Sequence, residues 1–257
     1  MFARRNLLQL EMGKLERFHL RTLGGSTILN TEWEVREQEI LHDVLRDGDA
    51  ILQLGGNIGA SCVTAARSKR LSSNVCVEPS NALIDILRHN CRSDGVQVVH
   101  GIIAEDCAGK RLTGGGDTAH NDWAARVTSS GEGQSLTCHP LASVAPKDGF
   151  SVLFADCEGC LPEFIDTYGS ELREKHPQLR AVVFERDGNE DYHGVDAWLR
   201  ESNFECTGGF HTTCTREPAQ YDCGAASRAK RTAAVLFVLL LTGVLAWVGG
   251  WLLAACV

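Results

Sequence analysis

The sequence predicts an α/β fold with a doubly wound, mostly parallel sheet, followed by a C-terminal transmembrane helix. Two observations lead to this prediction. Between residues 31 and 218, short apolar segments with strand character alternate with segments of helical periodicity. That alternation is typical of βαβ units whose strands are buried on both faces. Residues 232–257, by contrast, carry no charged side chain.

The length and the charge of the chain limit the classes of function. The 257 residues are enough for one core of moderate size with an appendage. Hydrophobic residues make up 44% and charged residues 23%, a composition typical of globular proteins. All charged residues precede position 232, so the net charge of -8 belongs to the preceding body. Because an acidic body lacks the basic surface that phosphate backbones require, we expect no nucleic-acid partner and favour a small-molecule acceptor.

The apolar pattern predicts the elements of the core in order. The expected strands are residues 50–54, 74–77, 97–103, 150–155 and 179–185. The expected helices are residues 34–45, 60–68, 81–90, 160–175 and 194–202. Residues 109–133 are rich in glycine and show little periodicity, so we interpret them as an insertion or a loop near the site.

Residues 1–30 are expected to form an N-terminal accessory helix or extension. Leu8, Met12, Leu15 and Leu20 follow a helical spacing. The apolar run before Glu11 is too short for the core of a secretory signal. A packed accessory helix is therefore favoured over a transit peptide or a helix on a membrane surface.

The 11 cysteines show no framework of paired spacings. In a chain of this length, that favours reduced thiols in a domain facing the cytosol. Cys157 and Cys160 form a Cys-x-x-Cys pair that would suit a redox or zinc site. A zinc ion would need two more ligands, and the further candidates are distant in the sequence: Cys206, Cys214, Cys223 and His211. We therefore expect small buried or unpaired thiols.

A glycine-rich segment, Gly55-Gly56-Asn57-Ile58-Gly59, joins the first strand of the core to an alanine-rich helix. Backbone amides without a nearby Cβ at a helix N-terminus let a ligand approach closely. The glycine spacing does not match the pyrophosphate-binding fingerprint, and no Gly-Lys-Ser/Thr follows that would indicate a P-loop. With Glu78 at the end of the next strand, the segment instead suits a ligand whose ribose needs a carboxylate partner, such as S-adenosylmethionine.

Four segments resemble the motifs of FkbM-type methyltransferases. Residues 51–59 (ILQLGGNIG) resemble the first motif, residues 75–79 (VCVEP) the second, and residues 154–159 (FADCEG) the Asp-x-Glu-Gly signature. Residues 181–185 (AVVFE) look like the following strand with its terminal acid. The resemblance covers residues 34–210. It implies a class I methyltransferase fold, S-adenosylmethionine as methyl donor, and O-methylation of a small molecule or sugar. Gln53 stands where the family usually has an acid, which implies weaker or altered donor binding.

Asp156 and Glu158 are the candidate catalytic residues because they follow the fourth strand, where open parallel sheets place their ligand crevice. Alternation along an extended segment would put both carboxylates on the same side. Our hypothesis is that Asp156 orients or deprotonates the acceptor hydroxyl, while Glu158 supports it or binds the donor's ammonium group. The alternative is that Asp156 caps the following helix and Glu158 holds the turn. Two carboxylates form an incomplete oxygen shell, so no metal site is expected.

The donor site is expected at the carboxyl ends of the first three core strands. Its candidate residues are Gln53, Gly55, Gly56, Asn57, Gly59, Glu78, Gly101, Ile102 and Glu105. We expect Glu78 to bind the ribose. Gly101 and Ile102 are expected to face the adenine, whose amino group would be reached by Glu105 or by the alternative Asp106.

Residues 232–257 predict a membrane-spanning helix, since about 20 apolar residues cross a hydrocarbon core roughly 30 Å thick. Arg228, Lys230 and Arg231 stand in the basic linker, residues 219–231, and positive flanks favour the cytosolic side. The chain is thus expected to be tail-anchored, with its domain facing the cytosol. A buried core helix and a lipid-anchor signal are the alternatives.

Together these predictions describe an S-adenosylmethionine-dependent methyltransferase at a membrane surface, acting on a small-molecule, sugar or lipid-linked hydroxyl. Two rival interpretations stay open. One is a membrane-tethered scaffold that keeps the fold without catalysis, as the substitution at Gln53 suggests. The other is a nucleotide-sugar or dinucleotide enzyme, which the glycine spacing does not favour.

Overall fold

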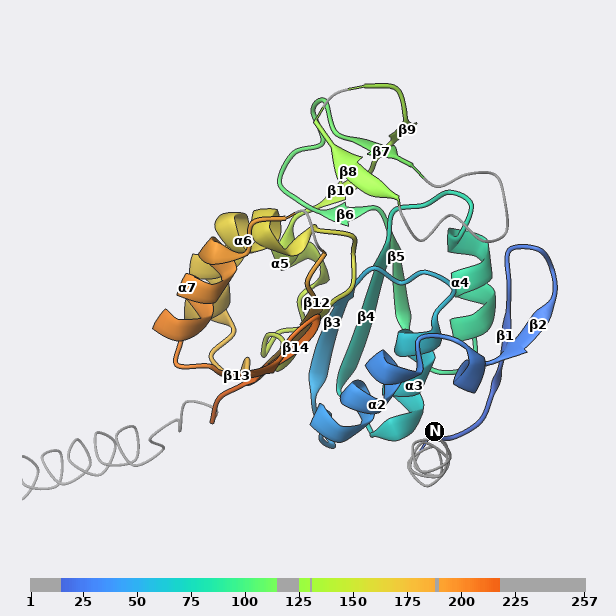
Figure 1. The fold of residues 1–257 in the computed structure, drawn as a ribbon, viewed down its shortest axis with the longest axis horizontal. Helices are drawn as coiled ribbons and strands as arrows, with labels where there is room; N and C mark the ends of the chain where they lie inside the picture. Colours follow the sequence, from blue (N-terminus) through green and yellow to red (C-terminus); the bar gives the residue numbers. More distant parts are fainter. Residues whose placement is uncertain (1–14, 115–124, 130, 188–189, 218–257) are drawn as a thin grey trace, which may run out of the picture. The chain divides into compact units, whose positions relative to one another are not determined.

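The central sheet of the domain has seven strands in the order β13-β14-β12-β11-β3-β4-β5 (Figure 1). In this computed structural model, the described residues are 15–114, 125–129, 131–187 and 190–217. The five parallel strands are β3 (Ala50–Leu54), β4 (Ser73–Glu78), β5 (Gln97–His100), β11 (Val152–Ala155) and β12 (Ala181–Glu185). At one edge, β14 (His211–Thr215) runs antiparallel to both β12 and β13 (Glu205–Gly208).

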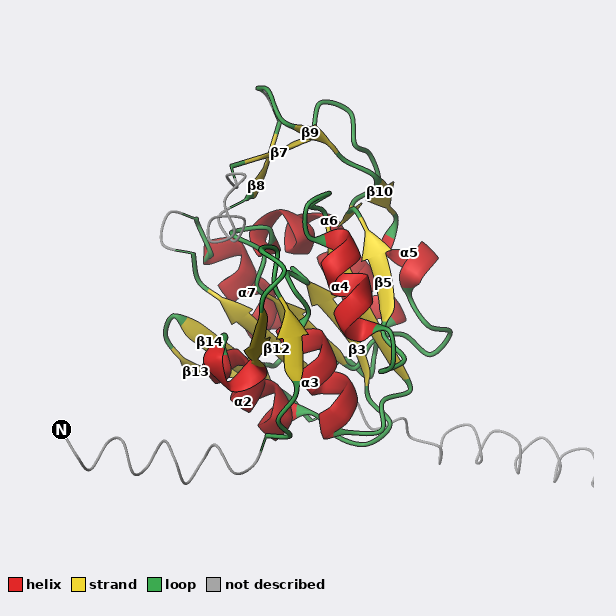
Figure 2. Ribbon diagram, turned by 90° about the vertical axis from the view of Figure 1, so that its right-hand side faces the viewer, coloured by secondary structure: helices red, strands yellow, loops and turns green. Residues whose placement is uncertain are grey.

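Helices cover both faces of this sheet (Figure 2). One side carries α2 (Val35–Val44), α3 (Ala60–Ser68) and α4 (Ile84–Cys91), and the other α5 (Leu141–Val144), α6 (Leu161–Lys175) and α7 (His193–Glu201). In α6, the buried residues Leu161, Ile165, Tyr168 and Leu172 recur at helical spacing and face the sheet. The layers confirm the predicted Rossmann-like α/β fold with a mostly parallel sheet.

The expected strand 97–103 is broken at Gly101. Gly101 has φ 140°, and a Cβ there would lie 2.2 Å from the carbonyl oxygen of Thr137. The backbone therefore leaves the central sheet after β5, and β6 (Ile102–Ile103) pairs with β10 (Cys138–His139) instead. This turn carries the chain over the carboxyl edge of the sheet.

The described part of the glycine-rich insertion belongs to a small antiparallel sheet rather than to a plain loop. The insertion supplies β7 (Arg111–Thr113) and β8 (Arg126–Thr128), and the residues just after it supply β9 (Gln134–Ser135). Figure 1 shows this sheet beyond the carboxyl ends of the central strands. The insertion therefore lies near the crevice, as predicted.

The described part of the expected N-terminal helix is extended. Strand β1 (His19–Arg21) forms a hairpin with β2 (Thr27–Leu29), followed by the 3-10 turn η1 (Asn30–Glu32). Leu20, which was assigned to a helical stripe, is fully buried in β1. The Asn90 side chain bonds the backbone N–H and C=O of Arg21, which fixes the hairpin against α4. Residues 1–14 lie outside the described residues.

The prediction of reduced thiols is wrong for most described cysteines. Within the ranges that the structure describes, four disulfides form: Cys62–Cys76, Cys107–Cys138, Cys157–Cys160 and Cys206–Cys214. Among the described residues, Cys91 alone is a free cysteine, and it is buried. The spacing gave no signal because folding brings partners together from different elements, such as Cys62 on α3 and Cys76 on β4. Cys157 and Cys160 bond to each other, so neither offers a thiolate to zinc.

No helix within the described ranges is long and apolar enough to cross a membrane. The expected span, residues 232–257, and the basic linker lie outside those ranges. The tail anchor and the domain boundaries after residues 30, 218 and 231 therefore stay predictions.

Candidate functional site

A cavity of about 550 Å³ opens at the carboxyl ends of the parallel strands. Its floor is formed by the ends of β3, β4 and β11, and residues of β7 and β8 line the opposite wall. Ligand crevices of open α/β sheets lie at this edge. The volume is within the usual range for small-molecule sites, roughly 300–1,000 Å³. This cavity is therefore the candidate functional site.

The glycine loop after β3 forms part of the floor of the cavity. Gly55 has φ 90°, and a Cβ at this position would lie 1.7 Å from the carbonyl oxygen of Asp156. The N–H of Gly55 donates to the carbonyl oxygen of Val77 at 3.0 Å, and the N–H of Asp156 donates to the carbonyl oxygen of Leu54 at 3.0 Å. The turn thus joins the ends of β3, β4 and β11, and β3 and β11 approach each other so closely that only glycine fits at position 55.

Glu78, the last residue of β4, holds this loop in place. One carboxylate oxygen accepts the N–H of Asn57 at 2.8 Å, and the other accepts the N–H of Ser80 at 2.7 Å. Glu78 is buried yet lines the cavity. Two backbone donors on one buried carboxylate fix both the glycine loop and the turn after β4.

Asp156 and Glu158 both line the cavity, but Cys157 between them lines it too. The segment after β11 is a turn, with φ 54° at Glu158, so the expected alternation along an extended segment does not explain where these side chains lie. Burial, reinforced by the Glu185 carboxylate to which Asp156 is hydrogen-bonded, raises the pKa of Asp156 well above its usual range. Burial also raises the pKa of Glu158, and the guanidinium of Arg126, 3.8 Å away, partly opposes that shift. The N-cap of α6 is Cys160, without a side-chain cap bond, so Asp156 does not cap that helix.

The remaining donor-site candidates divide into two groups. Those lining the cavity are Gly55, Gly56, Asn57, Glu78, Gly101 and Ile102. Gln53, Gly59 and Glu105 do not line it. Gln53 is fully buried and donates to the Asn74 side chain at 2.7 Å, because alternation along β3 turns it away from Leu52 and Leu54. Glu105 is exposed and accepts the Tyr168 hydroxyl at 3.0 Å.

Six charged residues of the cavity wall were not identified from the sequence: Glu34, Lys110, Arg126, Glu163, Asp166 and Glu190. Glu34 immediately precedes α2 with φ 42°, and burial together with the nearby Asp156 raises its pKa to about 8. Arg126 of β8 pairs with Glu190 at 3.3 Å. Glu34, Lys110, Arg126 and Glu190 lie far from Asp156 in the sequence, whereas Glu163 and Asp166 lie on α6, which follows it. No local motif marks any of the six.

Glu34→Gln is expected to remove a pH dependence of stability. Glu34 holds its proton more tightly in the folded chain, so its contribution to stability is complete below about pH 4.5 and is lost as pH rises towards 8. Between pH 5 and pH 8, the free energy of unfolding should therefore fall further in the wild type than in the variant, by about 1–3 kcal/mol. Urea unfolding at both pH values measures this. Glu171→Gln, which removes the ion-pair partner of the exposed Lys175, is the control. If the free energy of unfolding changes by the same amount between pH 5 and pH 8 in the wild type and in Glu34→Gln, the assignment of the raised pKa to Glu34 is contradicted.

No family model matches the sequence, and the curated proteins give no match. Several solved structures are similar to the chain. A precorrin-6y C5,15-methyltransferase from Geobacter metallireducens is 11% identical with a TM-score of 0.46, over 70% of this chain and 87% of that one. A putative tRNA (m1A22) methyltransferase from Streptococcus pneumoniae, in complex with S-adenosyl-L-methionine, is 11% identical with a TM-score of 0.42, over 73% and 76%. A protein of the NADB-Rossmann superfamily from Streptococcus agalactiae is 9% identical with a TM-score of 0.42, over 70% of this chain and 66% of that one. The match thus spans less than two thirds of the length of that protein.

Proposed function

We propose that the chain is an S-adenosylmethionine-dependent methyltransferase of the FkbM type that methylates a hydroxyl group. One observation carries the proposal: the glycine loop, Glu78 and Asp156 meet on one cavity at the carboxyl edge of the sheet. These residues come from three of the motifs in which the sequence resembles that family.

The residues of the cavity fit the methyl donor. Gly55 and Gly101 are positions where a Cβ would collide with backbone, so the chain turns closely there and leaves bare backbone on the cavity wall. We assign the amino acid end of the donor to the loop from Gly55 to Asn57, the ribose to Glu78, and the adenine to Gly101 and Ile102. The donor supplies an electrophilic methyl group on a sulfonium.

Asp156 is assigned as the general base for the acceptor hydroxyl. A base works best when its pKa lies near the operating pH, and the raised pKa of Asp156 moves it in that direction from the usual range of an aspartate. The wall formed by Glu158 and Arg126 would hold the acceptor in line, because positioning contributes much of the rate of such a transfer.

Asp156→Asn is expected to lower formation of S-adenosylhomocysteine by about 10²- to 10⁴-fold, the usual contribution of a general base. The full chain would be incubated with methyl-labelled donor and a panel of sugars and membrane lipid extract. Donor affinity, measured by calorimetry, should change by less than about three-fold, since an amide has the same shape. Asp148→Asn, at an exposed loop position, is the control. Full turnover in Asp156→Asn would refute the base role.

A scaffold without catalysis is the second candidate, and Gln53 favours it. The buried Gln53 side-chain oxygen has no hydrogen-bond partner within the described residues. Gln53 lacks the negative charge that the acid usual at this motif position would carry, and such a loss suits a protein that keeps the fold for binding without catalysis. Donor binding without any labelled product across the panel would favour the scaffold, whereas product formation would exclude it.

We also propose that residues 232–257 anchor the chain in a membrane, which suits a lipid-linked or membrane-delivered acceptor. Leu240→Arg combined with Leu241→Arg should release the protein from membranes, because an Arg at the centre of a span costs roughly 2.5–3.5 kcal/mol. Flotation after alkaline extraction measures this, with Leu240→Ala and Leu241→Ala as the control pair. Continued flotation of the Arg variant would place the anchor elsewhere.

Two features indicate different sides of that membrane. The basic linker favours the cytosolic side, whereas disulfides such as Cys107–Cys138 persist in oxidising compartments. Peptide mapping of the alkylated, unreduced protein from its native membrane distinguishes the two placements. Intact disulfide-linked peptides support an oxidising compartment, and alkylated free peptides support the cytosol.

A further inference from the structure

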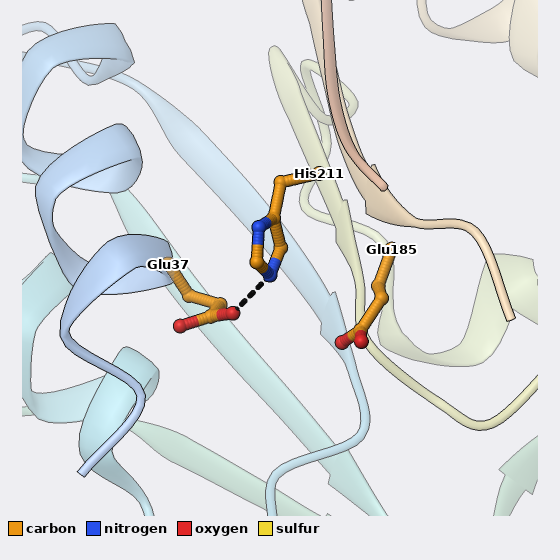
Figure 3. Close-up of side chains that lie close together, drawn as sticks. All are labelled: Glu37, Glu185 and His211. Atoms are coloured by element: carbon orange, nitrogen blue, oxygen red, sulfur yellow. Dashed lines mark ion pairs between the residues drawn. The ribbon is translucent and has the colours of Figure 1, made fainter. Parts of the chain in front are cut away.

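A histidine and two glutamates lie close together outside the cavity, where the start of α2 meets the end of β12 and the start of β14. Glu37 lies in the first turn of α2, Glu185 ends β12, and His211 begins β14. One nitrogen of His211 and one oxygen from each carboxylate all lie within 4.8 Å of one another. Figure 3 shows the imidazole between the two carboxylates, with both glutamates turned towards it. None of the three residues lines the cavity, so the cluster is separate from the proposed donor site.

Rigid elements fix this arrangement. Glu185 and His211 are directly opposite each other in the β12–β14 ladder, so their backbone positions are set by the sheet. α2 packs against β12 and brings Glu37 to the same point. The side chain of Glu37 is only 10% exposed and that of His211 25% exposed. Ligands held by a sheet and a packed helix can keep the geometry that a metal ion demands.

The charge around the cluster is unbalanced. The Nε2 atom of His211 forms an ion pair with Glu37. Asp156, from the end of β11, contacts Glu185. Arg186, the residue after β12, is turned to Asp196, its guanidinium lying 2.5 Å from that carboxylate. A single imidazole therefore faces several carboxylates in a partly buried space, and a divalent cation would offset that excess.

We propose that Glu37, Glu185 and His211 form a binding site for one divalent transition-metal ion. The donor set of one imidazole and two carboxylates suits ions such as Mn²⁺ and Zn²⁺ better than Mg²⁺, which prefers an all-oxygen shell and keeps several waters. A bound ion would cross-link α2, β12 and β14. Through Glu185 it would also orient Asp156, which makes the three ligands positioning residues with respect to the cavity.

Calorimetric titration of the chelator-treated full chain with Mn²⁺, without methyl donor, tests this site. We expect one ion per chain, and binding at least about ten-fold weaker in each of Glu37→Gln, Glu185→Gln and His211→Gln. Mg²⁺ should bind at least about ten-fold more weakly than Mn²⁺. The matched controls are His193→Gln, at the exposed start of α7, and Glu171→Gln on α6. Unchanged Mn²⁺ affinity in the three ligand variants, or no Mn²⁺ binding to the wild type, would overturn the proposal.

A second measurement uses the wild type and so does not depend on the folding of variants. Mn²⁺ is paramagnetic and, because its broadening falls steeply with distance, should broaden the imidazole resonances of His211 far more than those of His89 on α4 at sub-stoichiometric concentration. Equal broadening of both residues would show that the ion binds elsewhere. Because no donor is present in either experiment, a failure here is independent of whether the chain transfers methyl groups.

Discussion

Gly55→Ala is expected to abolish measurable donor binding and to lower the free energy of unfolding by at least about 3 kcal/mol. A left-handed backbone alone costs an L-residue roughly 1–2 kcal/mol. The new Cβ would also lie 1.7 Å from the carbonyl oxygen of Asp156, so the ends of β3 and β11 must separate. Separation disturbs the floor of the cavity at the point where the proposed donor and base meet. Urea unfolding and calorimetry with S-adenosylmethionine measure the two effects.

Gly48→Ala is the matched control for this prediction. Gly48 has φ 88°, close to that of Gly55, but a Cβ there meets nothing within 4 Å. Gly48→Ala should therefore lower the free energy of unfolding by the cost of the backbone conformation alone, about 1–2 kcal/mol, and should leave donor binding intact. Equal losses of stability in the two variants would mean that the contact between the strand ends is not what constrains Gly55.

Glu78→Gln is expected to weaken donor binding by about 10- to 100-fold, or roughly 1.4–2.7 kcal/mol. The two carboxylate oxygens of Glu78 accept the N–H groups of Asn57 and Ser80. In glutamine one of these oxygens becomes an amide nitrogen, a donor facing a donor, so the glycine loop or the turn loses its anchor. The variant also removes the charge that would bind the ribose.

Asp85→Asn is the control, since Asp85 is exposed on α4 and pairs only with Arg88 among the ion pairs of the described residues. Calorimetry with S-adenosylmethionine is again the measurement, with a thermal unfolding scan to verify that each variant is folded. Unaltered donor affinity in folded Glu78→Gln would remove Glu78 from the proposed site.

The core of the fold could be predicted because its signals are local. β3 and β12 are short apolar runs that match the expected residues 50–54 and lie within 179–185, and α6 carries a regular buried stripe. The break at Gly101 could not be seen, because it depends on the close approach of Thr137 far along the chain. The β13–β14 hairpin was missed for a different reason: its residues are mostly polar, and β13 is exposed throughout.

The site was predictable only where one strand end determines the direction of a side chain. The positions of Gly55, Glu78 and Asp156 on the cavity follow from the strands that precede them. Gln53 lies one residue before the end of β3, and the pleat turns its side chain to the other face. Glu34 and His211 reach this region only through packing of α2 and β14 against the sheet, for which no single segment holds a signal.

Calorimetric titration of the full chain with S-adenosylmethionine tests the central claim most directly, with NAD titrated in parallel. The proposed function predicts saturable binding of one S-adenosylmethionine per chain, lost in Gly55→Ala and kept in Gly48→Ala, and no binding of NAD at the same concentrations. Binding of NAD without any response to S-adenosylmethionine would contradict it and would identify the cavity as a dinucleotide site.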